Sequence, residues 1–245
     1  MAKDVVVTAE KIQKRKKFRK LVKLALLLLL LLLIVLYIVL QIIYSNGRFT
    51  IFLGSEGMME SGISLYDNLD DPTGKRKLEA EALEVMDNIS WKWLPDNVDT
   101  EADGAHNGEN YIAYSFYLEN QSNETIHYWY QIIVDDVIKN ADEAIRIGIY
   151  LNGELTTYAK ESPLSGGPEK AGAIDEITVP FKKDKIDKED TIIIEKRANF
   201  SPGDLDRFTI VIWLEGDDPE CVDAIKGGVV RMHMKLTEEK LVDNE

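Results

Sequence analysis

The stretch Ile145-Arg-Ile-Gly-Ile-Tyr-Leu-Asn-Gly-Glu-Leu-Thr-Thr-Tyr-Ala159 places an Asn-Gly pair between two runs rich in β-branched and aromatic residues. A two-residue type I′ turn requires positive φ at both central positions, and Asn-Gly adopts it readily. Apolar and polar side chains alternate in the flanking runs, which is the period of a strand with one buried face. We therefore predict a β-hairpin with Asn152 and Gly153 at its turn.

Similar strand patterns, separated by Gly, Pro, Asn and Asp, occupy most of the chain after residue 48. Many short strands at such intervals predict an all-β fold, an antiparallel β-sandwich that resembles a jelly roll. One boundary stays open, because Leu78, Ala82 and Leu83 have helical spacing and Lys75–Glu84 could begin as a helix. The other predicted strands are Phe49–Leu53, Ile63–Tyr66, Ala82–Leu94, Asn110–Glu119, Thr125–Val137, Ile174–Phe181, Thr191–Lys196, Arg207–Glu215 and Val229–Leu236.

Aromatic residues are concentrated in the middle of this region. Such an array can form a platform for sugar rings, or it can fill the core of a sandwich. Because the rings alternate within the predicted strands and do not gather in a loop, the core is the favoured interpretation. The residues are Trp91, Trp93, Tyr111, Tyr114, Phe116, Tyr117, Tyr128, Trp129 and Tyr130.

The segment before the predicted strands is uniformly apolar. Leu24–Ile43 contains 20 residues without a charge, including the eight consecutive leucines of Leu26–Leu33. At about 1.5 Å per residue, a helix of this length spans about 30 Å, the thickness of a bilayer's hydrocarbon core. We therefore predict one transmembrane helix over residues 24–43, with the lipid bilayer as its partner.

Charge sets the expected orientation of this helix. Residues 1–23 carry nine Lys and Arg against two Asp and Glu, a net charge of +7, so the rest of the −14 chain carries −21. Basic flanks stay on the cytoplasmic side, which predicts a single-pass protein of the cell membrane with a cytoplasmic N-terminus and an extracellular C-terminal domain. A signal peptide cleaved after Gly47 is the alternative. The apolar run exceeds the usual length of about 7 to 15 residues, which favours an uncleaved signal anchor.

These features divide the chain into expected parts. They are a basic cytoplasmic tail (1–23), a signal-anchor helix (24–43), a juxtamembrane segment with a possible first strand (44–62), the β-sandwich (63–236) and an acidic tail (237–245).

The net charge limits the kinds of partner that the extracellular domain is expected to bind. A net charge of −21 repels nucleic acid and opposes close stacking of subunits, so we expect no nucleic-acid partner and a monomeric extracellular domain. A protein or cell-wall partner remains open.

The single cysteine, Cys221, cannot form an internal disulfide, and export of a domain without disulfides favours a Gram-positive bacterium.

Three stretches together resemble uncharacterised exported proteins of Firmicutes and, more distantly, the camelysin and TasA-type biofilm matrix proteins. They are residues 111–120, residues 142–147 with the hairpin that follows, and residues 208–221 with Gly227-Gly228 after them. The resemblance covers roughly residues 48–236. It implies a jelly-roll sandwich on the cell surface and brings no catalytic residues. The matrix proteins have a cleaved signal and form fibres, whereas this chain has a long hydrophobic anchor.

Catalytic motifs are absent from the sequence. His106, His127 and His233 lie far apart, without cysteines or carboxylates at zinc-like spacing. Neither a Gly-x-Ser-x-Gly elbow nor a phosphate-binding glycine loop occurs. We therefore predict that the protein is not an enzyme, with no catalytic residues and no organic cofactor.

One acidic loop imitates a calcium site. Counting from Asp99, the loop has acidic side chains at positions 1, 3 and 5, Gly104 at position 6 and an amide at position 9. Alternating oxygen ligands and a central glycine are the pattern of calcium loops, although position 12 is Asn110 where a Glu is expected. The candidate metal ligands are Asp99, Glu101, Asp103, Asn107 and Glu109.

The sequence as a whole predicts a non-enzymatic, membrane-anchored structural or adhesion module of a bacterial cell surface. One alternative is a ligand-binding or accessory subunit that docks on another membrane protein. If the signal is cleaved, a secreted matrix-fibre subunit is a second alternative.

Overall fold

The structure is a computed structural model that describes residues 2–45, 49–54, 56–71, 73–83, 85–163, 178–182 and 189–239. Contacts between residues divide the chain into two compact units, Met1–Gly47 and Arg48–Glu245. Each unit is held together by its own internal contacts.

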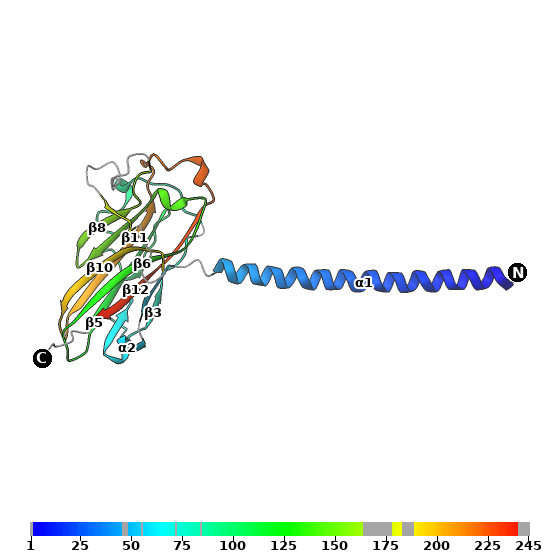
Figure 1. The fold of residues 1–245 in the computed structure, drawn as a ribbon, viewed down its shortest axis with the longest axis horizontal. Coiled ribbons are helices and arrows are strands. Elements are labelled where there is room, and N and C mark those ends of the chain that lie inside the picture. The colour runs from blue at the N-terminus through cyan, green and yellow to red at the C-terminus, as the bar shows by residue number, and fades with distance from the viewer. Residues whose placement is uncertain are drawn as a thin grey trace. The chain divides into compact units, whose positions relative to one another are not determined.

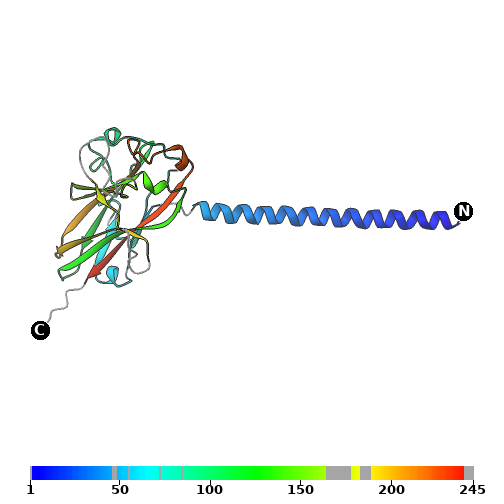
Figure 2. The ribbon, with the colours of Figure 1, turned by 45° about the horizontal axis from the view of Figure 1, so that its top comes forward.

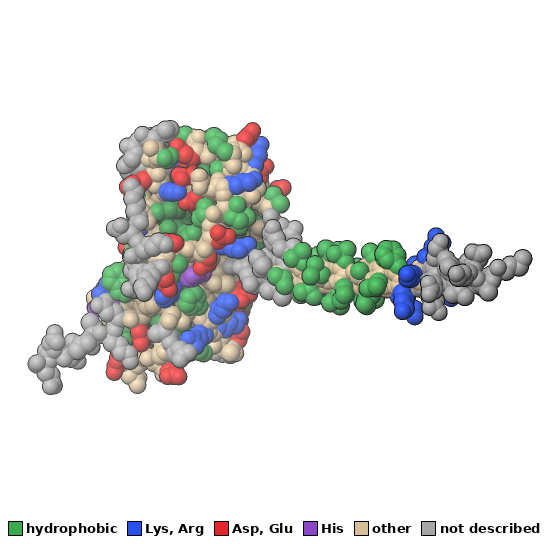
Figure 3. Space-filling model, turned by 45° about the vertical axis from the view of Figure 1, so that its right-hand side comes forward, with side chains coloured by type: hydrophobic (Ala, Val, Ile, Leu, Met, Phe, Trp, Pro, Cys, Tyr) green, Lys and Arg blue, Asp and Glu red, His purple; other side chains and the backbone are tan. Residues whose placement is uncertain are grey.

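The first unit contains a single helix, α1 (Ala2–Ser45, 44 residues). Gly and Pro are absent between residues 2 and 45, and Leu, Lys, Arg and Ala favour helix, so α1 continues through the basic residues before the predicted span. Within α1, Lys14–Val39 is long and apolar enough to cross a membrane, and its apolar residues are unburied. Figure 3 shows these apolar side chains along the helix, next to a group of Lys and Arg. The prediction of one N-terminal apolar helix is confirmed.

The second unit is a sandwich of two sheets, which Figures 1 and 2 show from two directions. Sheet A has the strand order β10-β6-β12-β1-β3, and sheet B has the order β2-β5-β11-β7-β8-β9, with β4 paired to β5. Sheet A consists of β1 (Thr50–Leu53), β3 (Lys77–Glu79), β6 (Ile126–Ile138), β10 (Thr191–Phe200) and β12 (Val229–Glu239). Sheet B consists of β2 (Ile63–Tyr66), β4 (Gly104–Ala105), β5 (Tyr111–Asn120), β7 (Ile145–Leu151), β8 (Glu154–Ala159), β9 (Val179–Pro180) and β11 (Leu205–Leu214). The predicted all-β sandwich is confirmed.

Short helices lie in the connections between strands. They are α2 (Glu56–Glu60), η1 (Trp91–Trp93), η2 (Ala141–Glu143) and η3 (Asp223–Ile225). Figure 1 shows η2 and η3, in green and orange, at one end of the sandwich and α2 at the opposite end.

The hairpin predicted around Asn152-Gly153 is present as β7 and β8. Asn152 and Gly153 have φ values of 52° and 86°, as a type I′ turn requires. The Asn152 side chain also donates to Asp206 Oδ1 at 2.7 Å and accepts from the Arg207 N–H at 2.9 Å. These hydrogen bonds tie the turn to the start of β11.

The predicted strand Ala82–Leu94 is wrong. Among its described residues the structure contains η1 and a single bridge between Ile89 and Glu215. The Trp91 N–H donates to the Glu215 carboxylate at 3.1 Å, not to a neighbouring strand. The segment instead covers the outer face of sheet B, where it builds a second core of Ile89, Leu94, Val98, Ala113, Val211 and Trp213.

Two further boundaries differ from expectation. The open choice at Lys75–Glu84 resolves to the strand β3, in which Leu78 is buried between two exposed residues. Of the predicted strand Ile174–Phe181, the structure contains β9, and residues 174–177 lie outside the described part of the chain.

β1 gives the sandwich a mixed strand pairing. It pairs in parallel with β12, from Thr50 opposite His233 to Leu53 opposite Leu236, and antiparallel with β3. The segment expected to be juxtamembrane (44–62) therefore supplies an interior strand of sheet A. At the other end, β12 includes residues 237–239, which were expected in the acidic tail.

The main core fills the space between the two sheets. Sheet A contributes fully buried side chains such as Ile51 and Met234, and sheet B contributes Phe116, Ile147 and Phe208. The rings of Phe116 and Phe208 stack with centroids 5.1 Å apart. Of the nine aromatic residues of the array, four lie in this core, namely Tyr114, Phe116, Tyr128 and Tyr130, whereas Trp93 is 73% exposed.

One ion pair lies fully inside the second unit. The Arg146 guanidinium on β7 is 2.7 Å from the Asp218 carboxylate, and their side chains are 2% and 0% exposed. Removing one partner of such a pair leaves a buried charge without compensation. The pair holds the turn after β11 against the start of β7.

We expect Arg146→Ala to lower the free energy of unfolding of the full chain by about 3–5 kcal/mol, because Asp218 loses its counter-charge. Lys226→Ala is the control, since Lys226 pairs with Asp223 on the surface and exposed pairs contribute little. Chemical denaturation in detergent measures both variants. Equal losses in the two variants would contradict the structural role of the buried pair.

Candidate functional site

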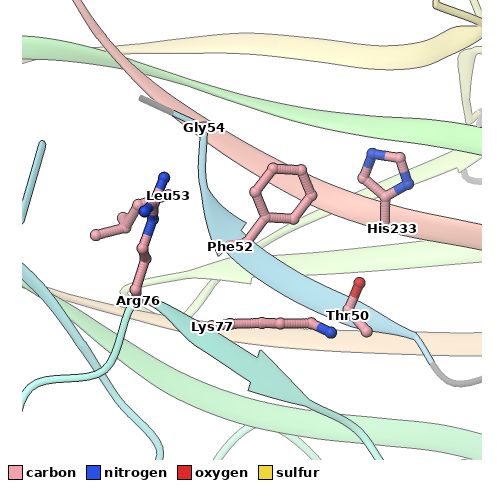
Figure 4. A pocket seen from close by; sticks show the side chains of 7 residues that line it. All are labelled: Thr50, Phe52, Leu53, Gly54, Arg76, Lys77 and His233. Atoms are coloured by element: carbon pink, nitrogen blue, oxygen red, sulfur yellow. The ribbon is translucent and has the colours of Figure 1, made fainter. Parts of the chain in front are cut away.

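An open cavity of about 460 Å³ lies on the outer face of sheet A. The pleat of β1 creates this face, because Ile51 and Leu53 are buried in the main core and the alternate residues, Thr50 and Phe52, point outward. The cavity is lined by Thr50, Phe52, Leu53, Gly54, Arg76, Lys77 and His233 (Figure 4).

Strand register decides which side chains meet in this cavity. Phe52 lies opposite Lys235 of β12 on one side and opposite Lys77 of β3 on the other. Directly opposite residues on neighbouring strands have Cβ atoms about 4.5–5.5 Å apart. An aromatic ring therefore lies between two lysines.

The Phe52 ring also contacts an imidazole. Its centroid is 5.2 Å from that of His233, with the ring planes inclined by 34°. Figure 4 shows Phe52 between His233 on one side and Arg76 and Leu53 on the other. His233 Nδ1 lies 2.9 Å from both oxygens of Asp135, which fixes the orientation of the imidazole.

Carboxylates next to the cavity orient its cations. Lys77 Nζ is 2.8 Å from Glu79, and Lys235 Nζ is 2.9 Å from Glu189. The lining itself includes Arg76 and Lys77 but no Asp or Glu. The charged side chains that line the cavity are therefore basic and not acidic, in a region of the chain where acidic residues outnumber basic ones.

The predicted calcium ligands are distributed along the loop without gathering. Asp103 Oδ1 accepts a hydrogen bond from the Tyr117 hydroxyl at 2.8 Å and lies 3.6 Å from the Arg207 guanidinium. The Asp99 main-chain carbonyl accepts from the Thr209 hydroxyl at 3.1 Å. A cation therefore already neutralises the central carboxylate of the predicted site.

The remaining predicted ligands have other surroundings. Asn107 Oδ1 accepts from the Ala113 N–H at 3.0 Å, and Asn107 Nδ2 donates to the Glu81 carbonyl at 2.8 Å. The side chains of Glu101 and Glu109 are exposed. Among the described residues, no three His, Cys, Asp or Glu side chains form a group that could hold a metal ion.

The three histidines have separate local environments. His106 contacts two main-chain carbonyls, those of Gly104 and Val98, at 2.9 and 3.0 Å, and so stabilises the loop before β5. His127 accepts from the Asn199 N–H at 2.9 Å, next to β10. His233 alone lines the cavity.

The cysteine lies beside buried carboxylates. Burial raises the pKa of Cys221, and the negative charges of Asp218 and Glu215 raise it further. The thiol is therefore protonated at neutral pH, which makes it a poor nucleophile and a poor metal ligand.

No pattern in the sequence indicates a site at this cavity. Alternation within Phe49–Leu53 indicated that Thr50 and Phe52 share a face, but it did not indicate their neighbours. Phe52 and His233 meet through a parallel pairing of the first and last strands, for which short-range sequence patterns carry no signal.

No protein-family model and no curated protein matches the chain. Two solved structures of a beta-glucosidase from Kluyveromyces marxianus are similar to it, one labelled with selenomethionine and one in complex with glucose. Their sequence identities are 10% and 13%, and their TM-scores are 0.25 and 0.22. Each match covers 74% of this chain but 16% of the beta-glucosidase chain.

This finding corrects one expectation. The prediction that the chain is not an enzyme does not stand as an exclusion: two of the solved structures that it resembles are of a beta-glucosidase, and the chain is assigned neither as an enzyme nor as a non-enzyme. The likeness is too distant to carry an argument about activity, and it assigns neither a substrate nor a catalytic residue to this chain.

The calcium hypothesis remains a prediction with a direct test. If the loop from Asp99 to Glu109 rearranges around the ion, millimolar calcium raises the melting temperature, since a ligand of the folded state stabilises it by mass action. Asp103→Ala then abolishes the rise. Magnesium at equal ionic strength is the control, and a melting curve unchanged by calcium refutes the site.

Proposed function

We propose that this protein is a membrane-anchored module that displays its β-sandwich on the outside of a bacterial cell, in a structural or adhesion role. The observation that carries the proposal is the combination of an apolar helix long enough to cross a bilayer with a sandwich that has its own core. The apolar stretch of the helix is unburied, whereas the sandwich buries its own apolar side chains between its sheets.

The charge distribution supports the orientation. Basic residues precede the apolar stretch, and the acidic residues are concentrated after it. Lys and Arg are retained on the cytoplasmic side, so residues after the helix cross the membrane. The −21 charge also keeps such a displayed domain soluble.

The position of β1 argues against the alternative of a secreted matrix-fibre subunit that donates this strand. A strand donated between subunits occupies the sheet of a neighbour and leaves its own sheet without it. Here β1 lies between β12 and β3 of its own sheet, and Ile51 is fully buried there. This arrangement favours a self-contained module over a subunit that donates this strand.

We expect protease added to intact, wall-stripped cells to degrade the sandwich domain while residues 1–23 stay protected. The reason is that the basic flank holds the N-terminus in the cytoplasm. Epitope tags at both ends report the result, and detergent lysis is the control that exposes both tags. Protection of the C-terminal tag in intact cells would refute the orientation.

A second test concerns β1. We expect Ile51→Ala to lower the free energy of unfolding by about 2–5 kcal/mol, as cavities in a core do, without changing the oligomeric state of the full chain in detergent. Light scattering coupled to size-exclusion chromatography measures the mass. Val222→Ala is the control, because Val222 is 52% exposed. An Ile51→Ala protein that dissociates from an assembly would favour strand exchange.

A further inference from the structure

We propose that the outer face of sheet A around Phe52 binds an anionic saccharide, a sugar ring that carries a carboxylate or phosphate group. The proposal gives the adhesion role a ligand class, and it rests on that proposed function for its biological setting. The site itself consists of the cavity lined by Phe52, His233, Arg76 and Lys77, with Lys235 beside it.

The aromatic surface suits one face of a sugar ring. Phe52 and His233 place two inclined rings side by side in an open cavity of about 460 Å³. The C–H groups on one face of a pyranose leave water when they pack on an aromatic ring, whose π face is electron-rich. An inorganic anion alone makes no use of such a surface.

The flanking cations suit an acidic substituent on that sugar. Lys77 and Lys235 lie opposite Phe52 on the neighbouring strands, and Arg76 precedes Lys77 in the chain. Each ammonium has three donors, so one carboxylate partner does not saturate a lysine. A guanidinium matches the geometry of a carboxylate or phosphate. A neutral sugar makes no use of this charge.

The charges of the cavity lining suit an anionic ligand. Residues after the basic tail carry a net charge of −21, which repels anions in general. The carboxylates of Glu79, Asp135 and Glu189 lie outside the cavity lining, beside Lys77, His233 and Lys235 respectively. The surface that a ligand would touch therefore presents Arg76 and Lys77 and no acidic side chain.

The test is calorimetric titration of the full chain in a non-ionic detergent with three probes. The probes are a β-1,4-linked glucuronate tetramer, the matched neutral glucose tetramer and inorganic phosphate. We expect the glucuronate tetramer to bind about tenfold more tightly than either other probe, because it alone engages both the ring and the cations. Raising salt should weaken its binding, since the cations are partly exposed.

Variants then assign the binding to this cavity. Lys77→Gln and Arg76→Gln should each weaken glucuronate binding about tenfold, the effect of one charge-assisted hydrogen bond. Phe52→Leu keeps an apolar strand residue but removes the aromatic face, and it should weaken the binding of both tetramers. A matched control is the double variant Lys92→Gln, Trp93→Ala, which removes an exposed lysine and a 73% exposed tryptophan from the other sheet's covering segment.

Three results would overturn the assignment of an anionic saccharide to this cavity. Equal affinity for both tetramers, phosphate bound as tightly as glucuronate, or losses in the control double variant equal to those in Lys77→Gln would each overturn it. The melting temperature of each variant is measured as a control that the variant is folded. Because the titration uses purified protein, its failure leaves the orientation untouched, and failure of the protease experiment leaves the titration untouched.

Discussion

The parallel pairing of β1 with β12 is the constraint on which the rest of the sandwich depends. It places the first residues of the domain beside the last strand, so the whole domain acts as the crossover that a parallel pair requires. Ile51 and Leu53 then enter the main core, and β3 gains a partner at the edge of sheet A. The same pairing brings Phe52 to His233 and so creates the cavity.

Buried charge organises one end of the domain. Glu215 is fully buried and accepts hydrogen bonds from Trp213 Nε1 at 2.9 Å and from the Trp91 N–H at 3.1 Å. Asp218 in the same turn pairs with Arg146. Polar groups removed from water need such partners, and these partners join the turn after β11 to β7 and to the segment over sheet B. The second core thus depends on an acidic turn.

The helix and the sandwich belong to separate compact units of this chain. The apolar stretch Lys14–Val39 of α1 is long enough to cross a bilayer, and its side chains are unburied. The sandwich buries its apolar residues between its own sheets and carries most of the negative charge. Within this acidic domain the cavity lining carries Arg76 and Lys77 and no Asp or Glu.

Local patterns in the sequence determined the N-terminal apolar helix, the hairpin at Asn152-Gly153 and the all-β class, because each follows from side chains close together in the chain. They did not determine the structure of Ala82–Leu94, whose aromatic and apolar residues imitate a strand. There the buried Glu215 carboxylate and the outer face of sheet B override the local preference. Nor did they determine the cavity. Phe52, Lys77 and His233 come from three strands distant in sequence, and only the packing of the whole domain selects the register that brings them together.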